Sequence, residues 1–177
     1  MQNYRLKIQY SGKFYAGWQI QPNVNTVQGE IVKAINIISG TTINLIGSGR
    51  TDAGVHALGQ VANFQIDKEL NLFRFKHSLN SLLPDDISVS EITEVPAEFH
   101  SRFDAKKRSY LYLFTKAKSP FYNDFSYNYP PIFNFEIERL NEISKLLLGE
   151  HDFTSFSRKK QIQKIWFVIS HLLNGEK

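Results

Sequence analysis

The sequence predicts an α+β fold in which helices pack on one face of an antiparallel sheet. Residues 4 to 10 alternate apolar and polar side chains, which is the period of a half-buried strand. Segments 27–38 and 70–83 carry apolar residues at helical spacing. Many links between the predicted strands are too short for a parallel crossover, which needs a dozen or more residues. The sheet is therefore expected to be mainly antiparallel.

The composition is that of an ordinary globular protein. The chain has 177 residues, 42% hydrophobic and 21% charged, enough for one large domain or two small ones. Cysteine is absent from the sequence, which excludes disulfides, thiolate metal sites and cysteine nucleophiles. The N-terminal segment lacks a signal-peptide pattern, and no apolar run approaches the ~20 residues of a membrane span. We therefore expect a cytoplasmic protein. The net charge of +4 permits a polyanionic partner without requiring one.

The first hundred residues are expected to form a subdomain, residues 1–100, that is complete in itself. After the first strand, a loop rich in glycine leads to a helix that Asn25 caps with Gln28 and that Gly40 ends. Strands at 42–46 and 60–66 flank a second loop. A helix over 70–83 stops before Pro84, and a strand at 87–92 follows.

The remaining residues, 101–177, are expected to form a partial second subdomain. A strand is predicted over 108–115, with aromatic side chains on one face. Residues 119–131 contain three prolines and are expected to be an extended loop. The apolar spacing of residues 137–147 predicts a helix that Gly149 ends.

The glycine loop GSGRTDAGVHALGQ, residues 47–60, places Arg50 and Asp52 among four glycines. It lacks the Lys–Ser/Thr of a P-loop and the spacing of a dinucleotide site. Asp52 and His56 would need further ligands to hold a metal ion. A tight turn, in which Asp52 caps a helix, remains one explanation. Another is a carboxylate nucleophile, with Arg50 holding its charge or gripping a phosphate.

A cluster of basic residues lies at RFDAKKR, residues 102–108, which contains four of the 21 basic residues. This cluster is either a solvated strand edge or a contact for nucleic-acid phosphates. Composition alone leaves both open.

The glycine loop and its continuation, GSGRTDAGVHALGQV, resemble the signature of the TruA-type tRNA pseudouridine synthases. Further segments agree in order and spacing, from residue 4 to about 160: YSGKFYAGWQIQ, TVQGEIVKAI, LNSLLPDDISV, FHSRFDAKKRSYLY and GEHDFTSFS. The resemblance implies a pseudouridine-synthase-like fold. It also implies isomerisation of uridine to pseudouridine in the anticodon stem-loop of tRNA, at positions 38–40 of the tRNA, without a cofactor or a metal.

The resemblance also implies roles for individual residues. Asp52 matches the catalytic nucleophile, and Arg50 matches the residue that occupies the space of the flipped-out base and pairs with the carboxylate. Tyr110 matches the aromatic residue that stacks on the uracil; its other reading is a core-facing strand residue. Lys107 and Arg108 are expected to contact the RNA backbone.

Two departures from the family pattern shape the expectations. Ser11 stands where the family carries Asp, and the sequence has no arginine after Arg158 that could match a second active-site arginine. We therefore expect a C-terminally truncated chain with an incomplete second half, for which the homodimer implied by the family is in doubt. Alternatives to an active synthase are a catalytically inactive RNA-binding remnant and a non-catalytic interaction module.

Overall fold

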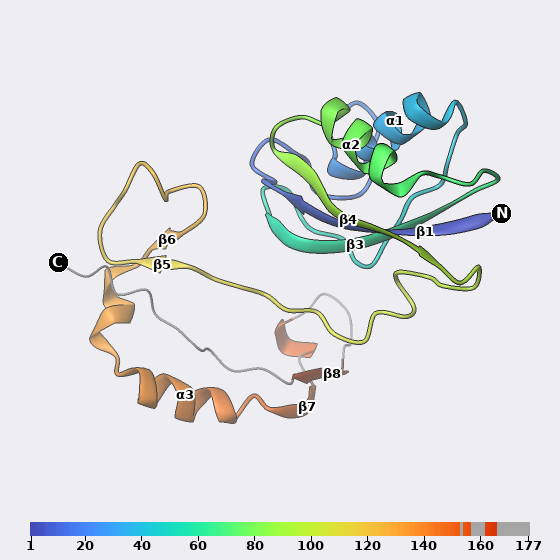
Figure 1. Ribbon diagram of the computed structural model, residues 1–177. Helices are drawn as coiled ribbons and strands as arrows, with labels where there is room; N and C mark the ends of the chain where they lie inside the picture. The colour runs from blue at the N-terminus through green and yellow to red at the C-terminus, as the bar shows by residue number, and fades with distance from the viewer. Residues whose placement is uncertain (153, 157–161, 166–177) are drawn as a thin grey trace. The chain divides into compact units, whose positions relative to one another are not determined.

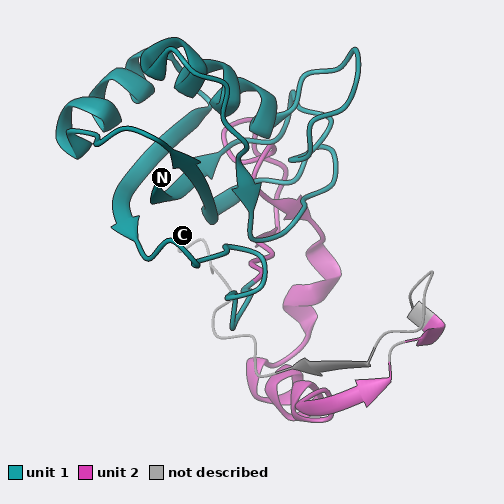
Figure 2. Ribbon diagram, turned by 90° about the vertical axis from the view of Figure 1, so that its right-hand side faces the viewer, with its two compact units in different colours: residues 1–109 teal, residues 110–177 magenta. Residues whose placement is uncertain are grey.

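The computed structural model describes residues 1–152, 154–156 and 162–165 (Figure 1). The chain forms two compact units, residues 1–109 and residues 110–177, shown in different colours in Figure 2.

The first unit is a four-stranded antiparallel sheet with two helices on one face (Figure 1). Its strands lie in the order β2-β3-β1-β4. The elements are β1 Gln2–Tyr10, α1 Val27–Ser39, β2 Ile46–Gly47, β3 Ala57–Ile66, α2 Leu72–Leu82 and β4 Ile87–Val95. The expected α+β class, with helices packed on one face of an antiparallel sheet, is confirmed.

The core lies between the sheet and the two helices. On the central strand β1, the alternate residues Tyr4, Leu6 and Ile8 are buried, as the period-2 pattern predicts. They belong to the same apolar cluster as Ile31 of α1 and Leu79 of α2. Complete burial of side chains of this kind contributes about 1.5–3 kcal/mol each, so packing of β1 against the helices stabilises the first unit.

Helix α1 begins one residue later than the expected cap. Thr26, not Asn25, is the N-cap, and its hydroxyl accepts a hydrogen bond from the N–H of Gly29 at 3.3 Å. The predicted capping partner, Gln28, is buried instead: its amide donates to the carbonyl of Leu45 and accepts from the N–H of Ile20. The predicted end is confirmed, because Gly40 adopts the left-handed conformation at φ 73°.

The predicted strand over residues 42–46 is shorter in the structure. Only Ile46 and Gly47 pair with β3. The preceding backbone groups bond to α1 instead, since the N–H of Ile43 donates to the side chain of Asn36, and Leu45 accepts from Gln28. These contacts with α1 take the place of hydrogen bonds to a neighbouring strand. The sequence of residues 42–46 does not reveal them, because the partners lie elsewhere in the chain.

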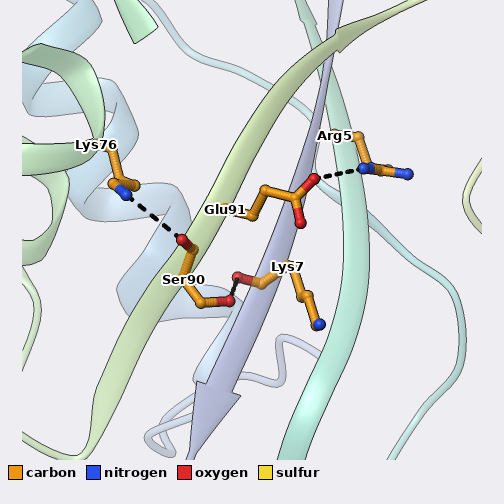
Figure 3. Close-up of polar contacts among 5 residues, drawn as sticks. All are labelled: Arg5, Lys7, Lys76, Ser90 and Glu91. Carbon is orange, nitrogen blue, oxygen red and sulfur yellow. Dashed lines mark hydrogen bonds and ion pairs between the residues drawn. The ribbon is translucent and has the colours of Figure 1, made fainter. Parts of the chain in front are cut away.

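Strand β4 is an edge strand with a bulge at Ser90 (Figure 3). Lys7 of β1 pairs with Glu91 and Ile8 pairs with Val89, so Ser90 is the extra residue. Its hydroxyl donates to the carbonyl of Lys7 at 3.1 Å, and its carbonyl accepts from Lys76 of α2 at 3.4 Å. The carbonyls of Ser90 and Lys7 at the bulge are therefore partnered.

The second unit has little regular sheet among its described residues. Its elements are β5 Phe114–Thr115, β6 Tyr127–Asn128, the 3₁₀ turn η1 Pro130–Asn134, α3 Ile137–Lys145, β7 Gly149–Asp152, the 3₁₀ turn η2 Thr154–Phe156 and β8 Ile162–Ile165. The strand predicted over 108–115 is wrong in extent, because its partner β6 offers only two residues for pairing. The predicted helix is confirmed as α3, but its predicted end is wrong: Leu146 is the C-cap, and Gly149 is instead the first residue of β7.

Candidate active site

The glycine loop connects β2 to β3 and presents Asp52 at a tight turn. The N–H of Val55 donates to the carbonyl of Asp52 at 3.3 Å, which closes a β-turn over residues 52–55. Gly54 sits at the second corner with φ 79°, a conformation that favours glycine. The side chain of Asp52 is exposed.

A second turn, Gly12–Tyr15, lies against the first. The N–H of Tyr15 donates to the carbonyl of Gly12 at 3.0 Å. The N–H of Gly54 then donates to the carbonyl of Tyr15 at 3.3 Å, and the N–H of Gly12 donates to Nδ1 of His56 at 3.3 Å. A Cβ at Gly12 would overlap the carbonyl oxygen of Val55. We call the Gly12–Tyr15 and Asp52–Val55 turns the paired turns.

Thr51, the residue before Asp52, is held from three sides. Its carbonyl accepts from the N–H of Trp18 at 3.0 Å, and its hydroxyl shares a 2.8 Å hydrogen bond with the hydroxyl of Tyr10. Gly17, at φ 97°, approaches so closely that a Cβ there would lie 2.5 Å from the Thr51 carbonyl oxygen. The backbone at Asp52 is therefore fixed while its carboxylate faces solvent.

The same segment is fastened to the start of α1. The N–H groups of Val27 and Gln28, which have no partner within the helix, donate to the carbonyls of Gly17 and Trp18 at 3.2 and 3.0 Å. The indole of Trp18 is buried against Gly47, where a Cβ would lie 2.5 Å from the ring nitrogen. The helix, the indole and both loops thus form one packed assembly.

The hydroxyl groups of Tyr10 and Tyr15 form hydrogen bonds in this assembly. Tyr15 donates to Oδ1 of Asp86 at 2.6 Å, and burial together with that carboxylate raises the pKa of Tyr15 well above its ordinary value. Burial also raises the pKa of Tyr10, an effect that its hydrogen bond to Thr51 partly offsets. Both tyrosines therefore stay neutral at physiological pH.

Arg50 lies on the same loop as Asp52 and is exposed. Within the part of the chain that the structure describes, neither side chain makes a hydrogen bond or an ion pair. The pairing of Arg50 with the Asp52 carboxylate, which the resemblance implies, stays a prediction. Both charged groups are accessible to a substrate.

Arg108 contacts the glycine loop directly. Its guanidinium donates to the carbonyl of Ser48 at 2.8 Å and lies beside Gly49. Gln60 of β3 supports the same stretch, because it accepts from the Ser48 hydroxyl and donates to the carbonyl of Gly49. Lys107 is exposed next to Arg108. The structure therefore places one end of the basic cluster at the start of the loop that carries Asp52.

Tyr110 is the first residue of the second unit, and its side chain is 76% exposed. The alternative expectation, that Tyr110 is a core-facing strand residue, is therefore wrong. Its stacking on a uracil beside Asp52 stays a prediction.

Sequence reasoning did not predict the residues that hold the loop, namely Tyr10, Gly12, Gly17, Trp18 and Thr51. The one available signal was the pair of glycines in the loop after β1, since such residues allow close backbone approach. The partners themselves are 30 or more residues away in the sequence, as with Tyr10 and Thr51, for which the separation is 41.

The described residues give no sign of a metal centre or a membrane span. Residues 1–152, 154–156 and 162–165 contain no group of three or more histidine or acidic side chains positioned to bind a metal ion. No helix in this part of the chain has both the length and the apolar composition needed to cross a bilayer.

Comparison with known proteins identifies relatives of this site and its surrounding fold. Residues 7–104, more than half of the chain, match the family model described as tRNA pseudouridine synthase. The chain is 46% identical to a tRNA pseudouridine synthase A of Bacillus sp. (strain KSM-64), covering 93% of this chain and 68% of that protein. It is 46% identical to the protein of that name in Brachyspira hyodysenteriae and 42% identical to that in Caldicellulosiruptor bescii, each covering 88% of this chain and 64% of the relative.

The chain therefore spans about two thirds of the length of these relatives. The matched residues 7–104 include both paired turns and the candidate nucleophile. On these grounds, the chain belongs to the tRNA pseudouridine synthase family.

Proposed function

We propose that this chain is a tRNA pseudouridine synthase that isomerises uridine in the anticodon stem-loop of tRNA, at positions 38–40, with Asp52 as nucleophile. The observation that carries this proposal is the exposed carboxylate of Asp52 on a backbone that the paired turns and Thr51 hold in place. Preorganisation of this kind is what a nucleophile needs, because a small displacement of the reacting group costs much of the rate.

The proposed reaction exchanges one bond of the base for another. The bond from N1 of uracil to C1′ of the ribose breaks, the base turns, and a bond from C5 to C1′ forms. C5 loses its proton and N1 gains one, so the product is an isomer of the substrate. Asp52 forms the transient covalent bond, either to C1′ or to the uracil ring.

The other proposed roles are those that the family resemblance implies for the charged and aromatic residues. Arg50 occupies the space that the extruded base leaves, since an enzyme acting on a base within a stem must first take it out of the stack. Tyr110 stacks on the uracil. Lys107 and Arg108 contact phosphates; Arg108 uses one guanidinium nitrogen on Ser48 and keeps further N–H donors for the RNA.

Release of tritium from tRNA carrying [5-³H]uridine tests the proposal, because the label leaves only when the new bond forms at C5. The wild-type chain should release label, and Asp52→Asn should abolish release while retaining tRNA binding. Asp67→Asn is the matched control, since Asp67 is an exposed aspartate at the other end of β3. Near-normal release by Asp52→Asn would remove Asp52 from the catalytic role. Binding without any release by the wild type would instead support an inactive RNA-binding protein.

The proposed partner is tRNA and the proposed location is the cytoplasm. The family resemblance also implies a homodimer, which sedimentation of the 177-residue chain would test.

A further inference from the structure

Phe14 is an exposed aromatic residue at the tip of the turn Gly12–Tyr15. Its side chain is 73% exposed, and the ammonium of Lys13 lies 5.3 Å from the ring centroid. A single exposed apolar residue is common on protein surfaces and implies no function by itself. The position of Phe14 within the paired turns distinguishes it from such a residue.

The backbone of Phe14 is held at a fixed place relative to the turn of Asp52. Phe14 occupies a corner of a hydrogen-bonded turn. The carbonyl of the next residue, Tyr15, accepts from Gly54, two residues after Asp52, and the hydroxyl of Tyr15 is anchored on Asp86. A rigid backbone of this kind presents an aromatic ring without a large loss of entropy on binding.

The Phe14 ring and the Lys13 ammonium beside it are suited to bind an unstacked nucleotide. Extrusion of a uridine from a stem-loop leaves neighbouring bases unstacked, and each has a π-face that can stack on an aromatic side chain. The cation of Lys13 beside the ring suits the phosphates of the same nucleotides. A protein partner would be expected to require a broader apolar surface without this charge.

We propose that Phe14 is a stacking platform for an unstacked base of the RNA whose uridine lies at Asp52, with Lys13 beside the adjoining phosphate. This inference rests on the proposed function, because it takes RNA as the substrate. It adds a base contact on the Asp52 side of the site, distinct from the proposed contact of Tyr110 with the uracil.

The test measures binding of an anticodon stem-loop RNA that carries 2-aminopurine next to the target uridine, whose fluorescence falls on stacking. Phe14→Ala in the 177-residue chain should weaken binding by about 5- to 150-fold and abolish the quenching. Phe14→Leu, which keeps apolar surface but loses the ring, should also lose the quenching, and Phe14→Tyr should retain it. The dependence of affinity on salt should not change, since no phosphate contact is removed. Phe73→Ala, at an exposed phenylalanine of α2, is the matched control and should bind like wild type.

Several results would overturn the inference: equal affinity of Phe14→Ala and wild type, quenching that survives in Phe14→Leu, a changed sedimentation coefficient as the sole effect, or no RNA binding by the wild type. The tritium assay separates this inference from the proposed function. Phe14-dependent binding without tritium release would sustain the stacking site and reject the reaction. Tritium release together with RNA binding that does not depend on Phe14 would sustain the reaction and reject the stacking site.

Discussion

The two units of this chain differ in where their apolar side chains lie. Among the described residues, every buried apolar side chain belongs to residues 1–109. In the described part of residues 110–177, Ser144 is the one buried residue, and large side chains such as Phe121 and Leu146 are exposed. The difference shows that the unit carrying Asp52 contains an apolar core of its own.

The contrast extends to hydrogen bonding. The first unit has ladders of eight paired residues between β1 and each neighbouring strand, whereas β5 and β6 pair over two. A sheet of two short strands is marginal by itself in water. The exposed aromatic side chains of the second unit are then an aggregation hazard unless another surface covers them.

Limited proteolysis should show the largest effect. Cleavage should concentrate after about residue 115, where backbone is exposed and few apolar contacts form, and should leave a resistant fragment close to residues 1–109. Mass spectrometry of the time course identifies the sites. A 177-residue chain that resists cleavage throughout would contradict the difference between the units.

Replacement of one glycine by alanine in each unit should give the next largest effect and should affect the two units differently. Gly12→Ala forces a Cβ onto the backbone of Val55 and should destabilise the first unit by about 3 kcal/mol. Gly149→Ala is the matched change in the second unit. It also has positive φ, at 106°, but the nearest atom to a Cβ there, beyond its chain neighbours, would be a side-chain atom of His151 at 3.9 Å.

Trp18 fluorescence during urea unfolding, recorded in chains that also carry Trp166→Phe, reports the unfolding of the first unit for both glycine variants. Gly149→Ala should leave this transition unchanged. A Gly12→Ala chain with wild-type midpoint would show that the paired turns can separate at little cost.

Removal of a buried leucine side chain should have an effect of similar size. Leu79→Ala empties a fully buried position between α2 and the sheet and should cost about 2–5 kcal/mol. Leu146→Ala changes a side chain that is 74% exposed and should cost little. Urea denaturation of each variant measures the change, and equal costs would mean that Leu146 is buried in solution.

Replacement of the basic residues should give the smallest effect. Lys107→Ala should reduce the slope of log affinity for tRNA against log salt by about 0.7–0.9 if it contacts one phosphate. Arg108→Ala should reduce the slope similarly and should also lower thermal stability, because it removes the bond to Ser48. Filter binding at several salt concentrations provides the slopes, and unchanged slopes would make this cluster a solvated edge.

Local patterns predicted the regular elements well and the site only in part. The alternation around Leu6 and the helical spacing around Ile31 reflect burial on one face, which a sequence displays directly. Asp52 stood out because of its glycine-rich surroundings and the family resemblance. The hydrogen bond from Tyr10 to Thr51 and the use of Gln28 on Leu45 were missed, because such contacts depend on how distant segments pack.

The chain of hydrogen bonds from the first turn of α1 through Gly17 and Trp18 to Thr51 has a kinetic consequence. Amides along it should exchange with deuterated solvent as one cooperative unit, since none can open without disturbing a buried indole or a helix start. The loop of Asp52 would then lack an independent open state on the microsecond scale that lids use. Adaptation during recognition would fall on the RNA, whose flexible loop can unstack and bend to reach Asp52, the proposed nucleophile, on a backbone that does not move.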